Sequence, residues 1–212
     1  MTTIIEAINE KVILGDDKGI TSCVERALAE GITASTILSS ALIPSMSEVG
    51  RRFENGEYFV PEMLMAARAM KAGLKPLKPI LAESQTEPLG RVAIGTVKGD
   101  LHDIGKNLVA IMLEGSGLEV IDLGVDVSPA QFVNAVHSGI DIVALSTLLT
   151  TTMPQMKAVV ETLAGVGLRD RVKVMVGGAP VTQAFAEEIG ADAYGKDAGA
   201  ATRLAKQFLG IP

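Results

Sequence analysis

Apolar residues recur at helical spacing through the first 82 residues of the chain. The first stretch ends at Gly15, and Asp17 and Thr33 are typical N-cap residues at the starts of a second and a third stretch. Pro61 suits the first turn of a fourth. The fourth stretch places its apolar residues at Met63, Leu64, Ala67, Met70 and Leu74. The pattern therefore predicts a bundle of four helices joined by short connections.

The pattern changes after residue 90. Residues 83–90 are polar and include Pro88 and Gly90, a composition typical of a linker. Short apolar runs then alternate with helical stretches to the end of the chain. The expected strands are 91–97, 118–123, 141–146, 172–176 and 191–194, and the expected helices are 104–114, 129–137, 153–164, 181–189 and 198–209.

These alternating units predict an α/β domain with a parallel, doubly wound sheet, because strands that are apolar at consecutive positions are buried on both faces. We expect a helical domain at 1–86 and the α/β domain at 87–212. Ligands of such sheets bind beyond the carboxyl ends of the strands. The chemistry is therefore expected at 96–103, 124–128, 146–152, 177–180 and 195–197.

Composition narrows the class of protein. The formal net charge of −6 and the pI near 5.0 argue against a nucleic-acid binder. One cysteine excludes an internal disulfide and a thiolate zinc cage. No apolar run reaches the roughly 18 residues of a membrane-spanning helix, and the acidic start does not resemble a signal peptide, so a cytoplasmic protein is expected.

The chain is also short of aromatic residues, with five Phe, two Tyr and no Trp. Aromatic side chains usually supply much of the buried area of a core. Two explanations are open: a helix-rich core of small aliphatic residues, or an interior partly filled by something other than protein.

The loop after the first expected strand contains Asp100-x-His102-x-x-Gly105. Its glycine spacing fits neither a dinucleotide-binding loop nor a P-loop. It does place an imidazole at the ligand edge of the sheet, with a carboxylate positioned to bind its other nitrogen, as around metal-bound histidines. The alternative is an ordinary loop histidine, followed by Asp103 as an N-cap.

Two further loops lie at the same edge. One, residues 146–152, is rich in hydroxyl groups, and the other, residues 177–180, begins with two glycines. Both suit a long polar ligand tail that runs along the sheet edge. The alternative is simple helix capping by Thr151 or Thr152 and a tight turn between strand and helix.

Together these motifs resemble the signature of cobalamin-binding domains of the base-off/His-on type. The helical region also resembles a known module: residues 56–62 (GEYFVPE) and 66–71 (AARAMK) are similar to the cap beside the B12-binding domain of cobalamin-dependent methionine synthase. The resemblance covers almost the whole chain. It is closest to the corrinoid proteins of anaerobic methyltransferase systems and implies a five-stranded, Rossmann-like and flavodoxin-like B12 domain.

The resemblance implies roles for individual residues. His102 would be the lower axial ligand of cobalt, Asp100 would bind the other side of its ring, and Thr152 would complete a proton relay. The cap would contact the corrin through Phe59 and Met63. The remaining cofactor-binding positions would be Leu101, Asp103, Ile104, Gly105, Ser146, Leu148, Thr150, Gly177, Gly178 and Ala179.

The implied function is that of a methyl carrier, which is not an enzyme alone. It would take a methyl group from a substrate:corrinoid methyltransferase and pass it to a methyltransferase acting on tetrahydrofolate or coenzyme M, with a reductive activase as a third partner. Residues 83–90 would act as the hinge of the cap. The sequence leaves open the methyl donor among methanol, methylamines, betaines and aryl methyl ethers, as well as the lower base and the oligomeric state. Two other functions are open: the B12-binding subunit of an adenosylcobalamin mutase, and a cobalamin-based light sensor.

Overall fold

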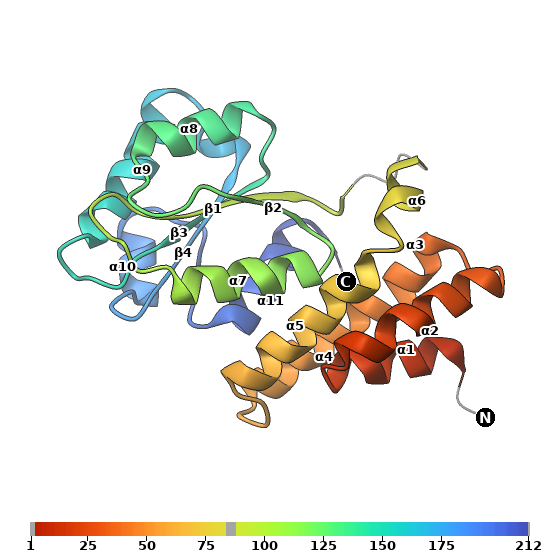
Figure 1. Ribbon diagram of the computed structural model, residues 1–212. Helices are drawn as coiled ribbons and strands as arrows, with labels where there is room; N and C mark the ends of the chain where they lie inside the picture. The colour runs from red at the N-terminus through yellow and green to blue at the C-terminus, as the bar shows by residue number, and fades with distance from the viewer. Residues whose placement is uncertain (1–2, 84–87, 212) are drawn as a thin grey trace. The chain divides into compact units, whose positions relative to one another are not determined.

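The computed structural model describes residues 3–83 and 88–211 of the chain. The chain forms two compact units, one of residues 1–88 and 115–117 and the other of residues 89–114 and 118–212. The first unit is helical and the second contains a parallel sheet (Figure 1). The expected domain limits, 1–86 and 87–212, stay a prediction, and residues 84–87 of the expected linker lie outside the described residues.

The helical unit confirms the bundle that the apolar pattern predicts. Helix α1 packs against α2, α4 and α5, and α2 also packs against α5. Positions expected in the interior are buried, among them Ile8, Ile20, Val49 and Met70. The helices are α1 (Ile4–Ile13), α2 (Asp17–Ala29), α3 (Ala34–Ile37), α4 (Ile43–Glu54), α5 (Val60–Leu74) and α6 (Lys78–Glu83).

The expected third helix is a continuous run of α3, a π-helical turn at Leu38–Leu42, and α4. In this turn the N–H of Ile43 donates to the carbonyl of Leu38, five residues earlier. Pro44 follows directly and has no N–H to donate, so the regular α-helical ladder is interrupted at this point.

Two details of the helix predictions need correction. Thr33 caps α3 as expected, but the N-cap of α2 is Asp16, whose Oδ1 accepts the N–H of Gly19 at 2.8 Å. Asp17 instead lies in the first turn of α2. Leu64 is exposed, because the buried face of α5 contains Met63, Ala67 and Met70, and Leu64 points away from it.

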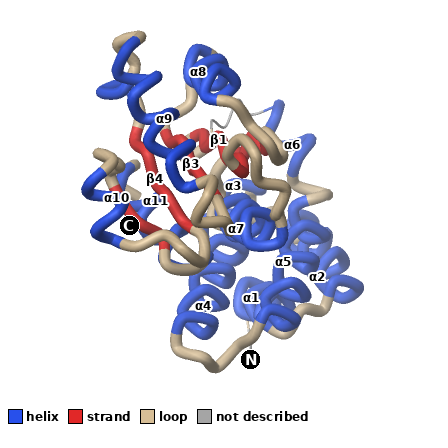
Figure 2. Tube along the Cα trace, turned by 90° about the vertical axis from the view of Figure 1, so that its left-hand side faces the viewer, coloured by secondary structure: helices blue, strands red, loops and turns tan. Residues whose placement is uncertain are grey.

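The second unit is the predicted α/β domain. Its strands form one parallel sheet in the order β2-β1-β3-β4-β5. Figure 2 shows β1, β3 and β4 of this sheet in red. The strands are β1 (Arg91–Thr96), β2 (Glu119–Asp122), β3 (Ile142–Ser146), β4 (Lys173–Gly177) and β5 (Ala193–Gly195). The helices are α7 (Ile104–Gly115), α8 (Pro129–His137), α9 (Met153–Gly165), α10 (Gln183–Glu188) and α11 (Ala198–Phe208), with a 3-10 turn at Arg169–Arg171.

Alternate side chains of each strand enter two different cores, which explains why the strands are apolar at consecutive positions. Ala93, Val143 and Val174 pack with residues of α8, α9 and α10 on one face. Val92 and Ile142 pack with residues of α7 and α11 on the other face. Figure 1 shows α8 and α9 on one side of the strands and α7 and α11 on the opposite side.

Gly95 makes room for the largest buried side chain of the sheet domain. A Cβ atom at Gly95 would lie 2.9 Å from Cζ of Phe132, which is fully buried. The fully buried ring of Phe132 therefore requires a glycine in the interior strand β1.

No helix in the described parts of the chain, 3–83 and 88–211, combines the length and apolar character that crossing a membrane requires.

We expect Asp16→Ala to lower the melting temperature more than Asp17→Ala. The first substitution removes the N-cap of α2 together with an ion pair to Lys11, whereas the second removes only an exposed ion pair to Arg68. Thermal unfolding followed by circular dichroism measures both. Equal losses in the two variants would contradict the assignment of Asp16 as the cap.

Candidate cofactor site

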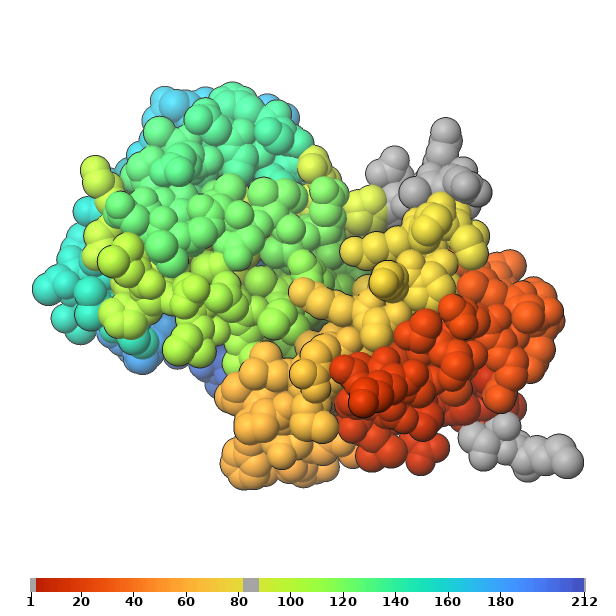
Figure 3. All heavy atoms as spheres, viewed as in Figure 1, coloured from red at the N-terminus to blue at the C-terminus, as the bar shows by residue number. Residues whose placement is uncertain are grey.

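The loops that follow the first four strands in sequence lie at the carboxyl edge of the sheet. They are residues 97–103 after β1, 123–128 after β2, 147–152 after β3 and 178–182 after β4. The segment after β1 and the beginning of α7, drawn yellow-green, lie at the surface in Figure 3. Every residue that the sequence predicts for the sheet part of the site lies in these loops, at a strand end beside them, or in the first turn of α7.

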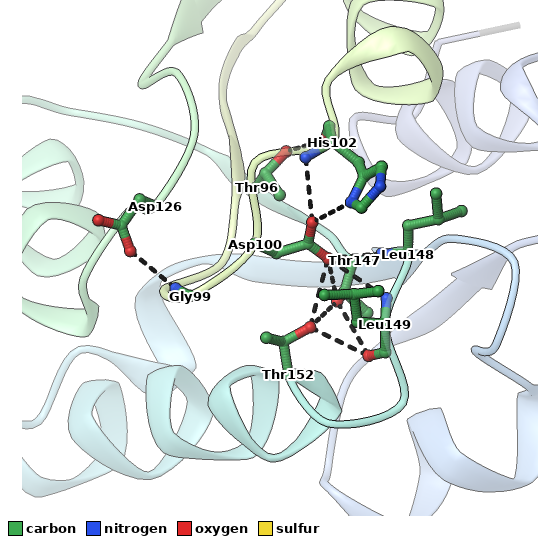
Figure 4. A network of polar contacts seen from close by, with 9 residues as sticks. All are labelled: Thr96, Gly99, Asp100, His102, Asp126, Thr147, Leu148, Leu149 and Thr152. Atoms are coloured by element: carbon green, nitrogen blue, oxygen red, sulfur yellow. Dashed lines mark hydrogen bonds and ion pairs between the residues drawn. The ribbon is translucent and has the colours of Figure 1, made fainter.

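His102 is held at three atoms. Its backbone N–H donates to Oδ1 of Asp100 at 3.0 Å, and its ring Nδ1 lies 2.7 Å from the same oxygen (Figure 4). Its carbonyl accepts a hydrogen bond from the Thr96 hydroxyl at 2.8 Å. The imidazole remains 52% exposed. The side chain is therefore fixed in direction while one edge of the ring faces outward.

This contact determines which nitrogen of His102 can bind a metal. An ionised carboxylate only accepts hydrogen bonds, so Nδ1 must carry the hydrogen. In the neutral imidazole Nε2 then keeps a free lone pair, and no hydrogen bond to the described residues occupies it. Arranged in this way, His102 can supply one nitrogen ligand.

Asp100 is fully buried, yet both of its carboxylate oxygens are satisfied. Oδ2 accepts the N–H of Leu148 at 2.7 Å, the hydroxyl of Thr147 at 2.8 Å and the N–H of Leu149 at 3.3 Å. Burial is the largest influence on the pKa of Asp100 and raises it. The donors outweigh burial, led by the N–H groups of His102 and Leu148, and hold the pKa well below its ordinary value. The carboxylate therefore stays ionised at neutral pH.

Two threonine hydroxyls continue the network. Thr152 Oγ1 is 3.3 Å from Oδ2 of Asp100 but only 2.6 Å from the hydroxyl of Thr147 (Figure 4). Since each hydroxyl has one hydrogen, the shortest consistent arrangement has Thr152 donating to Thr147 and Thr147 donating to Asp100. The sequence motifs predict Thr152 as a site residue but not Thr147, although Thr147 lies between the predicted residues Ser146 and Leu148.

Close packing requires glycine at two consecutive positions at the end of β4, Gly177 and Gly178. Gly177 is the last residue of β4, one residue beyond the expected strand end, and Gly178 has a φ of +127°. A Cβ at Gly178 would lie 1.7 Å from the Thr147 carbonyl oxygen, and one at Gly177 would lie 2.9 Å from the Gly195 carbonyl oxygen. The loop after β4 therefore packs directly against the loop after β3, whose Thr147 and Leu148 donate hydrogen bonds to Asp100.

Lys106 is a further residue that sequence analysis missed. It lies in the first turn of α7 and is buried, and its Nζ is 2.6 Å from each carboxylate oxygen of Asp122 at the end of β2. Nζ also lies 2.7 Å from Oδ1 of Asn107. This ion pair fixes the start of α7 to the sheet, so both ends of the histidine loop are anchored.

Comparison with known proteins places this site in a family. Two family models, each described as a B12 binding domain, match residues 90–203 and 4–78. The chain belongs to the B12-binding corrinoid proteins. Its cofactor is therefore cobalamin or a related corrinoid.

Relatives of this corrinoid protein match along its whole length. Dimethylamine corrinoid protein 1 of Methanosarcina acetivorans is 43% identical over 97% of both chains. The trimethylamine corrinoid protein of Methanosarcina barkeri is 44% identical and covers 98% of this chain and 97% of its own. A chain in the crystal structure of the methanol:cobalamin methyltransferase complex MtaBC from Methanosarcina barkeri is 28% identical, with a TM-score of 0.88 over 98% of this chain and 80% of that chain.

The residues around His102 fit a large apolar macrocycle. Ile104 is 83% exposed and Leu101 is 70% exposed, although apolar side chains of this size are usually buried. Most of the exposed large apolar side chains of the sheet unit gather at this edge: Leu101, Ile104, Val125, Leu148 and Leu149. We call this set the apolar rim. Asp103, Thr150 and Ala179 are also exposed here, and Ser146 is half-buried.

Gly105 gives a second reason why a large macrocycle fits beside His102. It lies in the first turn of α7, its φ is not positive, and a Cβ there would meet nothing within 4 Å. Glycine in a helix interior costs about 1 kcal/mol relative to alanine, with less expected in the first turn, and no packing against the described residues requires glycine here. A molecule lying close to the backbone does explain it.

The two expected cap contacts differ in exposure. Phe59 is 67% exposed, whereas Met63 is fully buried. Their roles toward the corrinoid stay predictions, as do those of the other cofactor-binding residues.

We expect Gly178→Ala to lower the stability of the fold and Gly105→Ala to weaken corrinoid binding. Gly178→Ala should lower the unfolding free energy by about 3 kcal/mol or more, from a left-handed backbone and overlap with Thr147. Gly105→Ala should stay within about 1 kcal/mol of the parent, yet bind corrinoid more weakly. Urea unfolding and cobalamin titration measure the two effects, and undiminished binding by Gly105→Ala would contradict the close approach.

Proposed function

We propose that this protein is a methyl carrier that binds its corrinoid in the base-off/His-on form, with His102 as the lower axial ligand. The observation that carries the proposal is the state of the ring: Nδ1 is fixed by a buried, ionised carboxylate, and Nε2 faces outward with a free lone pair. The apolar rim around His102 supports the placement of the macrocycle at this edge.

The bound corrinoid supplies the cobalt chemistry by which a methyl group is accepted and given up. The protein supplies the ligand and controls its basicity. Asp100 holds the proton on Nδ1 of His102 and so keeps Nε2 available and electron-rich. In the proton relay, the Thr152 hydroxyl takes up a proton from solvent and passes its own hydrogen to Thr147, which passes its hydrogen to Oδ2 of Asp100. The net transfer of one proton removes the negative charge of the carboxylate and makes Nε2 a weaker donor. We propose this relay as the means by which the ligand is strengthened or released.

The methyl group requires partner enzymes on both sides. Relatives of more than 40% identity are named dimethylamine and trimethylamine corrinoid proteins, and this favours a methylated amine as the donor. The structural match to a chain of a methanol:cobalamin methyltransferase complex supports docking to a separate substrate methyltransferase. We propose that a second methyltransferase, acting on tetrahydrofolate or coenzyme M, removes the methyl group, and that a reductive activase restores the active cofactor.

The relatives also favour the carrier over the two other functions considered. They cover 97% or more of both chains and are named corrinoid proteins.

We expect His102→Ala to lose the His-on state. In protein labelled with 15N at histidine and loaded with cob(II)alamin, electron paramagnetic resonance should show coupling to one axial 15N in the parent but not in the variant, and the label distinguishes the histidine from the 14N of the cofactor's own base. Binding should weaken about ten-fold or more, the scale on which groups at a metal site act. His137→Ala is the matched control, because His137 is the chain's other histidine and lies exposed on α8. Axial 15N coupling that survives in His102→Ala would refute the ligand assignment.

Loss of the Thr147 hydroxyl should damage the site more than its size suggests. Thr147→Val keeps the shape but removes one donor from the buried carboxylate of Asp100, which should cost about 1–3 kcal/mol of unfolding free energy. Thr147→Ser keeps the hydroxyl and is the control. Urea unfolding of the cofactor-free protein measures both, and equal stability of the two variants would contradict the contact.

A further inference from the structure

Asp126, in the loop after β2, has an unusual backbone. Its φ of +56° makes it the only non-glycine residue with a positive φ within 3–83 and 88–211. Residues with a Cβ adopt this left-handed conformation at a cost, and Asn, Asp and Gly tolerate it best. Asp126 is also exposed, so burial does not impose the conformation.

In this conformation, two groups of Asp126 form hydrogen bonds with the same short segment, Gly99–Asp100. The side-chain Oδ1 accepts the N–H of Gly99 at 2.7 Å (Figure 4), and the backbone N–H donates to the carbonyl of Asp100 at 3.0 Å. Asp126 therefore binds the segment on both sides of the Asp100 Cα atom. Gly99 is itself left-handed, with a φ of +83°, and lies in a turn in which the N–H of Asp100 donates to the Val97 carbonyl at 3.1 Å. This part of the histidine loop belongs to no helix or strand.

The loop that carries Asp126 is itself firmly anchored. The N–H of Thr96 donates to the carbonyl of Gly124 at 3.0 Å, and the N–H of Val127 donates to the carbonyl of Thr96 at 2.9 Å. The N–H of Gly124 also binds Oδ1 of Asp122, the partner of Lys106. Asp126 thus connects the histidine loop to a rigid strand end.

We propose that Asp126 is a positioning residue for His102: it fixes the Gly99–Asp100 backbone so that the Asp100 carboxylate meets Nδ1 of the ring. The inference rests on the proposed function, in which that contact leaves Nε2 free to bind cobalt. It assigns a role to a residue that lies 27 positions from Gly99 in the sequence and touches neither the imidazole nor the carboxylate of Asp100.

Three substitutions separate geometry from charge. Asp126→Asn removes the charge but keeps a side-chain acceptor and a residue that tolerates the left-handed backbone. Asp126→Glu keeps the charge but carries the carboxylate one methylene further from the backbone. Asp126→Gly relaxes the backbone and removes the acceptor. The proposal predicts that Asn resembles the parent, whereas Glu and Gly are impaired.

Two measurements follow His102 directly. In the cofactor-free protein, 15N chemical shifts of the ring report the fraction with hydrogen on Nδ1, and we expect this fraction to fall in Asp126→Gly and Asp126→Glu. With cob(II)alamin bound, the His-on to His-off ratio should fall about five-fold in these variants, the equivalent of losing one hydrogen bond. Circular dichroism checks that each variant is folded, and Asp126→Glu maintains the comparison if Asp126→Gly unfolds.

The outcomes are distinguishable. If the parent labelled with 15N at histidine shows no axial 15N coupling, the proposed His-on function fails. If the parent shows it and Asp126→Gly and Asp126→Glu match the parent in both measurements, only the role of Asp126 is overturned. If Asp126→Asn is impaired as strongly as Asp126→Glu, the negative charge rather than the geometry of the acceptor is needed, and the proposal is also overturned.

Discussion

The candidate site depends on one buried carboxylate. Asp100 joins two loops that are distant in sequence: its own loop, through His102, and the β3 loop, through Thr147, Leu148 and the α9 N-cap Thr152. A buried charge without partners would be strongly destabilising, so the donors that surround it must be in place when the sheet edge forms. The same hydrogen bonds keep the carboxylate ionised and turn the imidazole outward. The hydrogen bonds around Asp100 therefore both stabilise the fold and leave Nε2 of His102 free to bind a metal.

Much of the fold could be predicted because its signals are local. The period of apolar residues distinguished bundle from sheet, and strands apolar at consecutive positions indicated burial on both faces, which the two cores confirm. Strand ends were less predictable because pairing decides them. β4 extends to Gly177 since that residue pairs with Ser146 on one side and Gly195 on the other, and neither neighbour is close in sequence. The cap of α2 was assigned to Asp17 rather than Asp16 for a similar reason: two adjacent aspartates satisfy the same pattern, and only the turn geometry chooses between them.

In the site, too, contacts between residues close in sequence could be predicted, whereas contacts between residues distant in sequence could not. Asp100 and His102 are two residues apart in one loop, so their contact follows from spacing. Thr147, Lys106 and Asp126 act across 16 to 47 positions of sequence. No local pattern marks such residues, because a threonine, a lysine and an aspartate are unremarkable at a loop or a helix end. Their importance appears only when the parallel order β2-β1-β3 brings the strand ends together.

The glycines of this edge fall into two kinds, and the difference bears on what the edge is for. Gly178 is explained by the chain itself, since a Cβ there would collide with the Thr147 carbonyl. Gly105 is not, since a Cβ there would meet nothing, and the helix would gain from alanine. The open space at Gly105 leaves room for a molecule from outside the chain to approach the backbone closely. The exposed Ile104 beside it and the outward-facing ring of His102 point the same way, and a flat apolar macrocycle lying against this turn accounts for all of these features.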